Sequence, residues 1–273
     1  MAQLGIDFGT TNSLFVAYDK KRNQFTYFNF SGDRPIPTSS TVWYHDNSIS
    51  IGSDARENIN TFAGVEGHHF EKSIKLKLGN EYGVNVFGNN VQPYMIAAEI
   101  LRHIKRVAVE DWAAVQAGVD VHRAIFTVPI NFNGIQREAL RKAAHEAGIE
   151  VTTFIHEPFA AVVGYYFTKG IVNSTQEIIS EIKKLNGKFL LTFDWGGGTL
   201  DITIIKVENG KMIEVGTSEL TGKAGDKFDE DIANWAWVKF LNKFGSKYDS
   251  GFLEQIRKDK WDLMLSRAER CKI

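Results

Sequence analysis

The stretch LLTFDWGGGTLDITIIKV, residues 190–207, begins with an uninterrupted apolar run and continues with alternating apolar and polar positions. An uninterrupted run of this length is typical of a strand that is buried on both faces. The run ends at Asp194, and the glycines at 196–198 then predict a tight turn. A second strand is expected to begin at Thr199.

The same pattern occurs near the start of the chain. Residues 4–18 read LGIDFGTTNSLFVAY, in which an apolar strand ends at Asp7, a turn follows with Gly9, Thr10 and Thr11, and a second strand leaves. Two such strand–turn–strand units, far apart in one chain, indicate a duplicated domain. If the two hairpins face one another, both turns can contact one polyphosphate, and the two aspartates come close to one metal ion.

Most of the remaining chain alternates predicted strands with amphipathic helices. Helical spacing of apolar residues covers 92–112 and 135–147, the second ending at Gly148, and a helix with proline in its first turn begins at Glu157. Strands are expected at 25–30, 41–44, 48–51, 124–129, 151–155 and 212–217, a loop or irregular helix at 60–69, and further helices at 176–185, from Gly225 and at 253–273. The pattern predicts an α/β protein in which mixed sheets are flanked by helices.

Composition narrows the class of protein. The chain of 273 residues is 43% hydrophobic and 24% charged, with a formal net charge of −1. These values are typical of a soluble globular protein and give no reason to expect nucleic acid or an acidic membrane as a partner. The single cysteine, Cys271, excludes an internal disulfide framework. No apolar run approaches the roughly 18 residues of a membrane span, and no secretion signal is recognisable, so the cytoplasm is the expected location.

The two turns suggest phosphate and metal chemistry. Consecutive glycine N–H groups form a concave anion site, and an aspartate at the mouth of the turn suits a hydrated divalent cation. A plain hairpin turn is the alternative for either copy alone. The absence of a GxxxxGK[ST] segment and of a GxGxxG segment after a strand argues against a P-loop enzyme and a dinucleotide-binding fold. His68 and His69 have no further His or Cys at metal-ligand spacing, so solvent exposure is expected for them.

Several segments together resemble the Hsp70 family of the actin, sugar-kinase and Hsp70 ATPase superfamily. They are IDFGTTNS from Ile6, TVPINFNGIQREALRKAAHEAG from Thr127, HEPFAAVVGYY from His156, FDWGGGTLDIT from Phe193 and AGDKFDEDI from Ala224, with shorter similarities in SIKLKLG from Ser73 and AERCK from Ala268. The resemblance covers nearly the whole chain in the family's order. It implies two ribonuclease-H-like lobes around a nucleotide cleft, the first at residues 1–166 and an incomplete second at 167–273.

The resemblance also implies roles for individual residues. Asp7 and Asp194 would hold a hydrated Mg²⁺, and Lys75 would face the terminal phosphate. Glu157, Asp201 and Thr199 would complete the catalytic set, with Glu157 and Asp201 orienting water. The phosphates of ATP or ADP would bind to Gly9, Thr10, Thr11, Asn12, Gly196, Gly197, Gly198 and Thr199, the ribose side to Gly225, and the purine side to Glu269 and Lys272. Pro129 and Arg137 match the family's relay from nucleotide to partner domain.

The implied function is that of an Hsp70-like chaperone nucleotide-binding domain. It would bind and slowly hydrolyse Mg-ATP to drive peptide-binding cycles in the full-length protein. The implied partners are client polypeptides, a J-domain co-chaperone and a nucleotide exchange factor. Two alternatives share the cleft: a sugar-kinase-type phosphotransferase, which needs an acceptor-hydroxyl pocket, and an actin-like filament ATPase. The segments AGDKFDEDI and HEPFAAVVGYY favour the chaperone.

The chain departs from the family pattern at several positions. Trp195 stands where the family usually has leucine, Ala224 where it usually has glycine, and the segment 169–188 is longer than usual. A tyrosine is common in the family at the position of Asn12. The sequence stops inside a helical pattern at Ile273, so we expect it to be the front part of a longer protein. ATPase activity is accordingly expected of the full-length protein.

Overall fold

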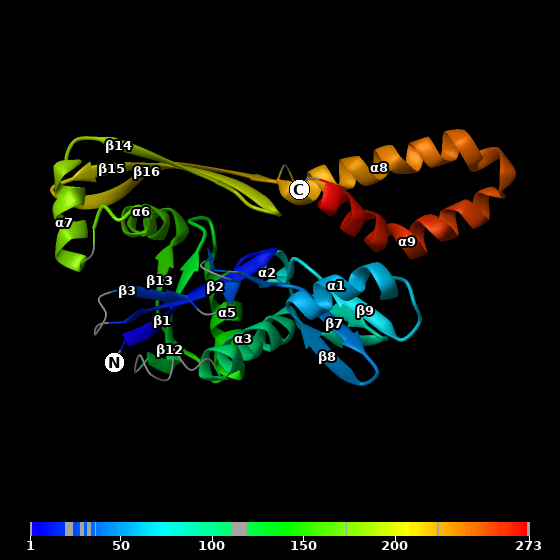
Figure 1. Ribbon diagram of the computed structural model, residues 1–273, viewed down its shortest axis with the longest axis horizontal. Coiled ribbons are helices and arrows are strands. Elements are labelled where there is room, and N and C mark those ends of the chain that lie inside the picture. The colour runs from blue at the N-terminus through cyan, green and yellow to red at the C-terminus, as the bar shows by residue number, and fades with distance from the viewer. Residues whose placement is uncertain are drawn as a thin grey trace.

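The computed structural model describes residues 2–19, 24–27, 30–31, 34–35, 37–110, 119–172, 174–222 and 224–271. It is a mixed α/β structure in which helices flank several sheets, as the sequence predicted. Figure 1 shows a larger N-terminal sheet with its helices below a long three-stranded C-terminal sheet, from which a pair of long helices extends.

The N-terminal sheet has the strand order β13-β12-β1-β2-β3, and β6 pairs with β2. Its strands are β1 (Ala2–Asp7), β2 (Asn12–Asp19), β3 (Gln24–Tyr27), β6 (Thr38–Ser39), β12 (Val119–Val128) and β13 (Glu150–His156). β1, β12 and β13 run parallel, whereas β2 runs antiparallel to β1. The carboxyl ends of the three parallel strands therefore meet at one edge, where Asp7 pairs with Thr127. That edge is where open α/β sheets bind ligands.

Two helices supply much of the core of the N-terminal sheet. α3 (Pro93–Glu110) buries its predicted apolar stripe, which includes the fully buried Ile96. α5 (Gly134–Glu146) begins with a capping box in which the Asn133 side chain accepts a hydrogen bond from a backbone N–H of the first turn. It ends before Gly148, which has the positive φ of 69° expected of a glycine just beyond a helix.

A small sheet of order β8-β7-β9 packs with α1 beside the N-terminal sheet. The elements are β7 (Val42–His45), β8 (Ser48–Ile51), α1 (Ser53–Phe62) and β9 (His68–Glu71). The strands predicted at 41–44 and 48–51 form a hairpin, and the residues of the turn between them, Asp46 and Asn47, both have a positive φ. The prediction of a loop or irregular helix at 60–69 is confirmed for residues 63–67 and was wrong at its ends, because α1 continues to Phe62 and β9 begins at His68. α1 buries only Ala55 and Ile59, too few apolar residues to give a clear periodic signal.

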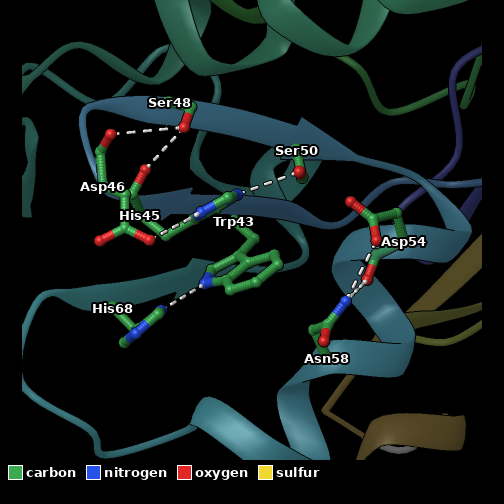
Figure 2. Close-up of polar contacts among 8 residues, drawn as sticks. All are labelled: Trp43, His45, Asp46, Ser48, Ser50, Asp54, Asn58 and His68. Atoms are coloured by element: carbon green, nitrogen blue, oxygen red, sulfur yellow. Dashed lines mark hydrogen bonds and ion pairs between the residues drawn. The ribbon is translucent and has the colours of Figure 1, made fainter.

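Trp43 forms the centre of this small sheet (Figure 2). Its indole ring stacks on the His45 ring with centroids 3.6 Å apart, and its Nε1 donates a hydrogen bond to His68 Nδ1 at 3.2 Å. The solvent exposure predicted for His68 and His69 was therefore wrong, because pairing of β9 with β7 partly buries both. No group of three or more side chains that could hold a metal ion occurs within the described ranges.

The C-terminal sheet is antiparallel, with the order β14-β15-β16. Its strands are β14 (Phe189–Trp195), β15 (Thr199–Glu208) and β16 (Lys211–Thr221). The prediction that the first of these is buried on both faces was wrong. Leu190 packs against the apolar cluster that contains Val207, but the alternate side chains of Leu191 and Phe193 are 65% and 56% exposed. An apolar run shows that one face of a strand is covered, and it does not show that the second face is.

Four longer helices complete the arrangement: α6 (Glu157–Thr168), α7 (Thr175–Lys184), α8 (Gly225–Phe244) and α9 (Ser250–Cys271). α6 contacts both β13 and β14, and α8 and α9 pack as the pair that Figure 1 shows. The predicted lobe boundary at residue 166 lies inside α6, and this division stays a prediction. The short elements are β4 (Phe30–Ser31), β5 (Arg34–Pro35), α2 (Ile74–Lys77), β10 (Val84–Val86), β11 (Asn89–Val91) and η1 (Gly245–Lys247).

Candidate functional site

The two hairpins singled out in the sequence meet across one cavity. The turn after β1 and the turn after β14 both line this cavity, which measures about 420 Å³, and Asp7 and Asp194 line it together. The turns also touch: a Cβ built on Gly197 would lie only 2.0 Å from Thr11 Oγ1. The internal repeat therefore corresponds to a spatial pair, with one turn from the N-terminal sheet and one from the C-terminal sheet. We call this space the phosphate cavity.

Glycines in the two turns leave no room for a larger side chain, and one buried hydroxyl between the turns has no hydrogen-bond partner among the described residues. A Cβ on Gly9 would lie 2.0 Å from the Asn12 carbonyl oxygen, and one on Gly198 would lie 2.8 Å from Leu76. Thr11 Oγ1 is buried and has no hydrogen-bond partner among the described residues. Buried hydroxyls are nearly always satisfied in folded proteins, so an acceptor-rich ligand between the turns fits this position.

The carboxylates of Asp7 and Asp194 provide a donor set for a divalent cation. Asp7 Oδ1 accepts a hydrogen bond from Thr127 Oγ1 at 2.8 Å, the residue beside it in the sheet register. Burial raises the pKa of Asp194, and the charge of Asp7 raises it further, against the opposing effect of Lys75. Two carboxylates close enough to repel one another fit a hydrated Mg²⁺, which prefers oxygen ligands and keeps several waters.

Lys75 lies in α2 and forms a buried ion pair with Glu157. Its Nζ is 2.7 Å from Glu157 Oε1 at the start of α6, and Lys75 is only 7% exposed. Burial raises the pKa of Glu157 to about 7; Asp7 and Asp194 act in the same direction, and Lys75 opposes them. Lys75, Glu157, Asp7 and Asp194 thus all line the phosphate cavity.

The C-terminal sheet adds further polar groups at the same end. Asp201 accepts a hydrogen bond from Thr199 Oγ1 at 2.8 Å, and both residues line the cavity. Burial raises the pKa of Asp201, against the Thr199 hydrogen bond, and the charges of Glu219 and Asp194 raise it further. Glu219 in turn accepts a hydrogen bond from Asn131 Nδ2 at 3.1 Å across the cavity.

A second cavity of about 390 Å³ continues from the first, and Thr10 and Thr11 line both. Glu269 of α9 lines this second cavity, where its Oε1 lies 2.6 Å from Arg56 Nη2 of α1. Ser73 donates a hydrogen bond to Asp226 Oδ2 of α8 at 3.2 Å in the same region. We call this space the nucleoside cavity, because its place beside the phosphate cavity suits the rest of a nucleotide.

The other residues expected at the site are placed as follows. Gly196 lines the phosphate cavity, and its carbonyl oxygen accepts a hydrogen bond from Gly225 N at 3.1 Å, which joins the turn to the start of α8. Gly225 itself lines neither cavity. Pro129 lines the phosphate cavity, and Arg137 Nε donates to the Phe132 carbonyl at 2.9 Å. Lys272 lies outside the described residues.

Sequence reasoning missed several polar residues of the two cavities. Arg56 and Glu219 lie in segments without a distinctive motif, whereas Asn131 lies in the segment TVPINFNGIQREALRKAAHEAG that carries the family resemblance but was given no role. Asp226 lies in the segment AGDKFDEDI that carries the family resemblance, but it was not predicted to line a cavity.

Comparison with known proteins points to the family that the motifs suggested. A family model described as "Hsp70 protein" matches residues 3–273. Relatives described as "Chaperone protein DnaK" are similar to the chain. That of Mycoplasma mycoides subsp. mycoides is 32% identical over 99% of this chain and 40% of its own length, and that of Thermosipho africanus is 31% identical over the same shares. That of Mycoplasmopsis agalactiae is 33% identical over 85% of this chain and 34% of its own length.

The chain spans about 40% of the length of the relatives that it matches over nearly its whole extent. The matches favour the chaperone family over the sugar-kinase and actin-like alternatives. A search of the described helices finds none with the length and apolar character needed to cross a membrane.

Proposed function

The chain belongs to the Hsp70 family, and on that premise we propose that it is the nucleotide-binding part of an Hsp70-type chaperone, which binds Mg-ATP and hydrolyses it slowly to ADP and phosphate. One observation carries the proposal. Asp7 ends β1, Asp194 lies one residue before the end of β14, and both line the same cavity between two turns in which Gly9 and Gly197 leave no room for a Cβ.

The two cavities divide the nucleotide between them. The backbone of Gly9, Gly196 and Gly197, together with the Thr10 and Thr11 hydroxyls, faces the phosphates. Thr11 Oγ1, buried without a partner in the described part of the chain, donates to a phosphate oxygen. The ribose and purine extend into the nucleoside cavity toward Glu269. Charge-assisted hydrogen bonds of this kind are among the stronger polar contacts that proteins make.

Asp7 and Asp194 are the residues that would hold Mg²⁺ through its water shell. When bound, the cation neutralises charge on the phosphates, which is the main requirement of phosphoryl transfer besides positioning. The protein supplies the positioning: Thr127 fixes the Asp7 carboxylate, and Thr199 fixes that of Asp201.

Lys75 and Glu157 exchange partners when the terminal phosphate arrives. In the structure the Lys75 ammonium contacts Glu157 at 2.7 Å. A phosphate oxygen carries more charge than the carboxylate and draws Lys75 toward it. Glu157 is then left to accept a hydrogen bond from the attacking water, together with Asp201. The ion pair therefore holds the Lys75 ammonium close to the terminal phosphate and the Glu157 carboxylate close to the attacking water.

The relatives are longer than this chain, and the activity of a protein of their length is also a proposal. We assign it the peptide-binding cycle of an Hsp70, with client polypeptides, a J-domain co-chaperone and a nucleotide exchange factor as partners. The cytoplasmic location expected from the sequence stays a prediction.

The proposal is tested by calorimetric titration of the purified protein with ATP, with and without Mg²⁺. Binding is expected to require Mg²⁺, and Asp194→Asn is expected to weaken it by about tenfold or more, because one charged ligand of the cation shell is lost. Asp46→Asn is the matched control, since Asp46 is an exposed turn residue with positive φ, which asparagine tolerates. Binding that ignores Mg²⁺ and is equal in the two variants would overturn the proposal.

A further inference from the structure

The hydrogen bond between Asn131 and Glu219 joins the two sheets across the phosphate cavity. Asn131 lies in the loop between β12 and α5, and Glu219 lies near the end of β16, 88 residues later in the chain. The bond from Asn131 Nδ2 to Glu219 Oε2 measures 3.1 Å, and both residues line the phosphate cavity. None of the roles assigned above uses this contact.

Both oxygens of the Glu219 carboxylate are held. Thr221 Oγ1 donates to Oε1 at 3.1 Å, while Asn131 donates to Oε2 at the same length. Thr221, on the same strand, holds one oxygen of the carboxylate, so the other oxygen points in a fixed direction. The Glu219 side chain therefore loses little conformational freedom when it contacts Asn131. Hydrogen bonds to a charged acceptor are also stronger than those between neutral groups.

We propose that Glu219 and Asn131 form a closing contact of the cleft, which holds the C-terminal sheet against the N-terminal sheet at the phosphate end and so sets how long a nucleotide stays bound. This inference rests on the proposed nucleotide function. Glu219 is a positioning residue in it, because it acts by holding the two sheets together.

Glu219 and Asp201 are register partners on neighbouring strands of the C-terminal sheet, and the charge of Glu219 helps to raise the pKa of Asp201. This repulsion acts within one sheet and does not separate the two sheets. The hydrogen bond from Asn131 is the member of this group of contacts that joins the C-terminal sheet to the N-terminal sheet.

The contact is distinct from those at the other end of the cleft. Arg56 and Glu269 join α1 to α9, and Ser73 and Asp226 join the start of α2 to α8, both around the nucleoside cavity. Among the described residues, Thr10 and Thr11 are the only ones that line both cavities, and neither pair shares a cavity with Glu219. Loss of the Asn131–Glu219 bond therefore opens the phosphate end and leaves the nucleoside contacts in place.

The first measurement needs no nucleotide. Spin labels on Glu138→Cys of α5 and Asn242→Cys of α8, in a Cys271→Ser background, report the distance between the two parts of the protein. Asn131→Ala and Glu219→Ala are expected to broaden the distance distribution and shift it to longer values. The double variant is expected to add nothing to either single change, because each removes the same bond. Glu219→Gln keeps an acceptor oxygen for Asn131 and is expected to restore the original distribution.

The second measurement is the rate at which a fluorescent ADP leaves after mixing with excess ATP. Release is expected to be about two- to fivefold faster in both alanine variants, because the lost hydrogen bond is exposed to solvent, with Glu208→Ala on the neighbouring strand as the control. Unchanged label distances in both alanine variants would overturn the inference, whatever the release rates. If no variant, nor the unmodified protein, binds ADP, the proposed function fails, and the label distances still decide whether the contact closes the cleft.

Discussion

Glu157 lies near one cation and two carboxylates, and burial changes the pKa of Glu157 more than these charges do. The ammonium of Lys75 is 2.7 Å from its carboxyl group, yet the pKa rises to about 7, because burial and the charges of Asp7 and Asp194 outweigh the lysine. An acid with this pKa takes up a proton as the pH falls through neutrality, well above its ordinary range. In the metal-free protein Glu157 is therefore about half protonated at pH 7.

Mg²⁺ binding is expected to release protons near pH 7. A cation between Asp7 and Asp194 cancels the two charges that help to raise the pKa of Glu157, so that pKa falls and roughly half a proton leaves. Calorimetry of Mg²⁺ binding in two buffers of different ionisation enthalpy measures the release. The same enthalpy in both buffers would contradict the prediction, and Glu157→Gln is expected to reduce the difference between them.

At the scale of single residues, the sequence located the site but predicted only some of the residues that line it. The repeated strand–Asp–x–Gly turn predicted that Asp7 and Asp194 face one ligand, and they line one cavity. A repeat carries that information because both copies form the same antiparallel hairpin, with an aspartate near the end of its first strand. Asn131 and Glu219 carry no such information, because a lone amide and a lone carboxylate are equally common on any polar surface.

At the scale of elements, hydrophobic periodicity predicted where helices and strands occur better than it predicted how deeply each of them is buried. The amphipathic spacing of α3 and α5 was sufficient, because a helix that buries one stripe shows it in its own residues. β14 was identified as a strand but assigned the wrong burial, since coverage of its second face depends on elements far away in the chain. The short hairpin of β10 and β11 went unpredicted, because three-residue strands hold too few positions for a pattern.

The exposed face of β14 is expected to promote self-association. Among the described residues this strand pairs with β15 alone, so one edge is open, and Leu191 and Phe193 are exposed beside it. Open apolar edges are templates for pairing with another chain. Phe193→Lys is expected to lower light scattering at high protein concentration, because the charge opposes pairing.

A matched control separates edge pairing from general surface hydrophobicity. Ile135 is 69% exposed but lies on α5, away from any strand edge, so Ile135→Lys is expected to change the scattering little. An equal decrease in both variants would show that the strand edge has no special part. Circular dichroism of each variant checks that the fold is retained.

At the scale of the whole molecule, α1 and α9 meet along one seam above the nucleoside cavity. Arg56 and Glu269 form its ion pair at 2.6 Å, and Ser266 Oγ donates to Asn60 Oδ1 at 3.3 Å. The chain after α1 approaches α9 closely as well, since a Cβ on Gly64 would lie 1.9 Å from the Asp259 carbonyl oxygen. The seam joins the first helix of the chain to the last one described.

Loss of the ion pair in this seam is expected to speed nucleotide release modestly. Arg56→Ala is expected to raise the rate about two- to fivefold, since partly exposed ion pairs contribute little. Higher salt is expected to raise the rate in the unmodified protein and less in the variant. Arg123→Ala, which breaks the surface pair with Glu150, is the control. Equal rates and equal salt dependence in all three proteins would exclude the seam from the control of release.

The division of the phosphate cavity between two sheets has a thermodynamic consequence. A nucleotide bound as proposed would contact Asp7 in one sheet and Asp194 in the other, so it would link two hairpins that are far apart in the chain. It would then stabilise both sheets together, by a free energy that grows with the logarithm of one plus the ratio of the free nucleotide concentration to Kd. Unfolding of either hairpin would abolish binding, so the concentration of nucleotide would affect the fraction of the protein that is folded.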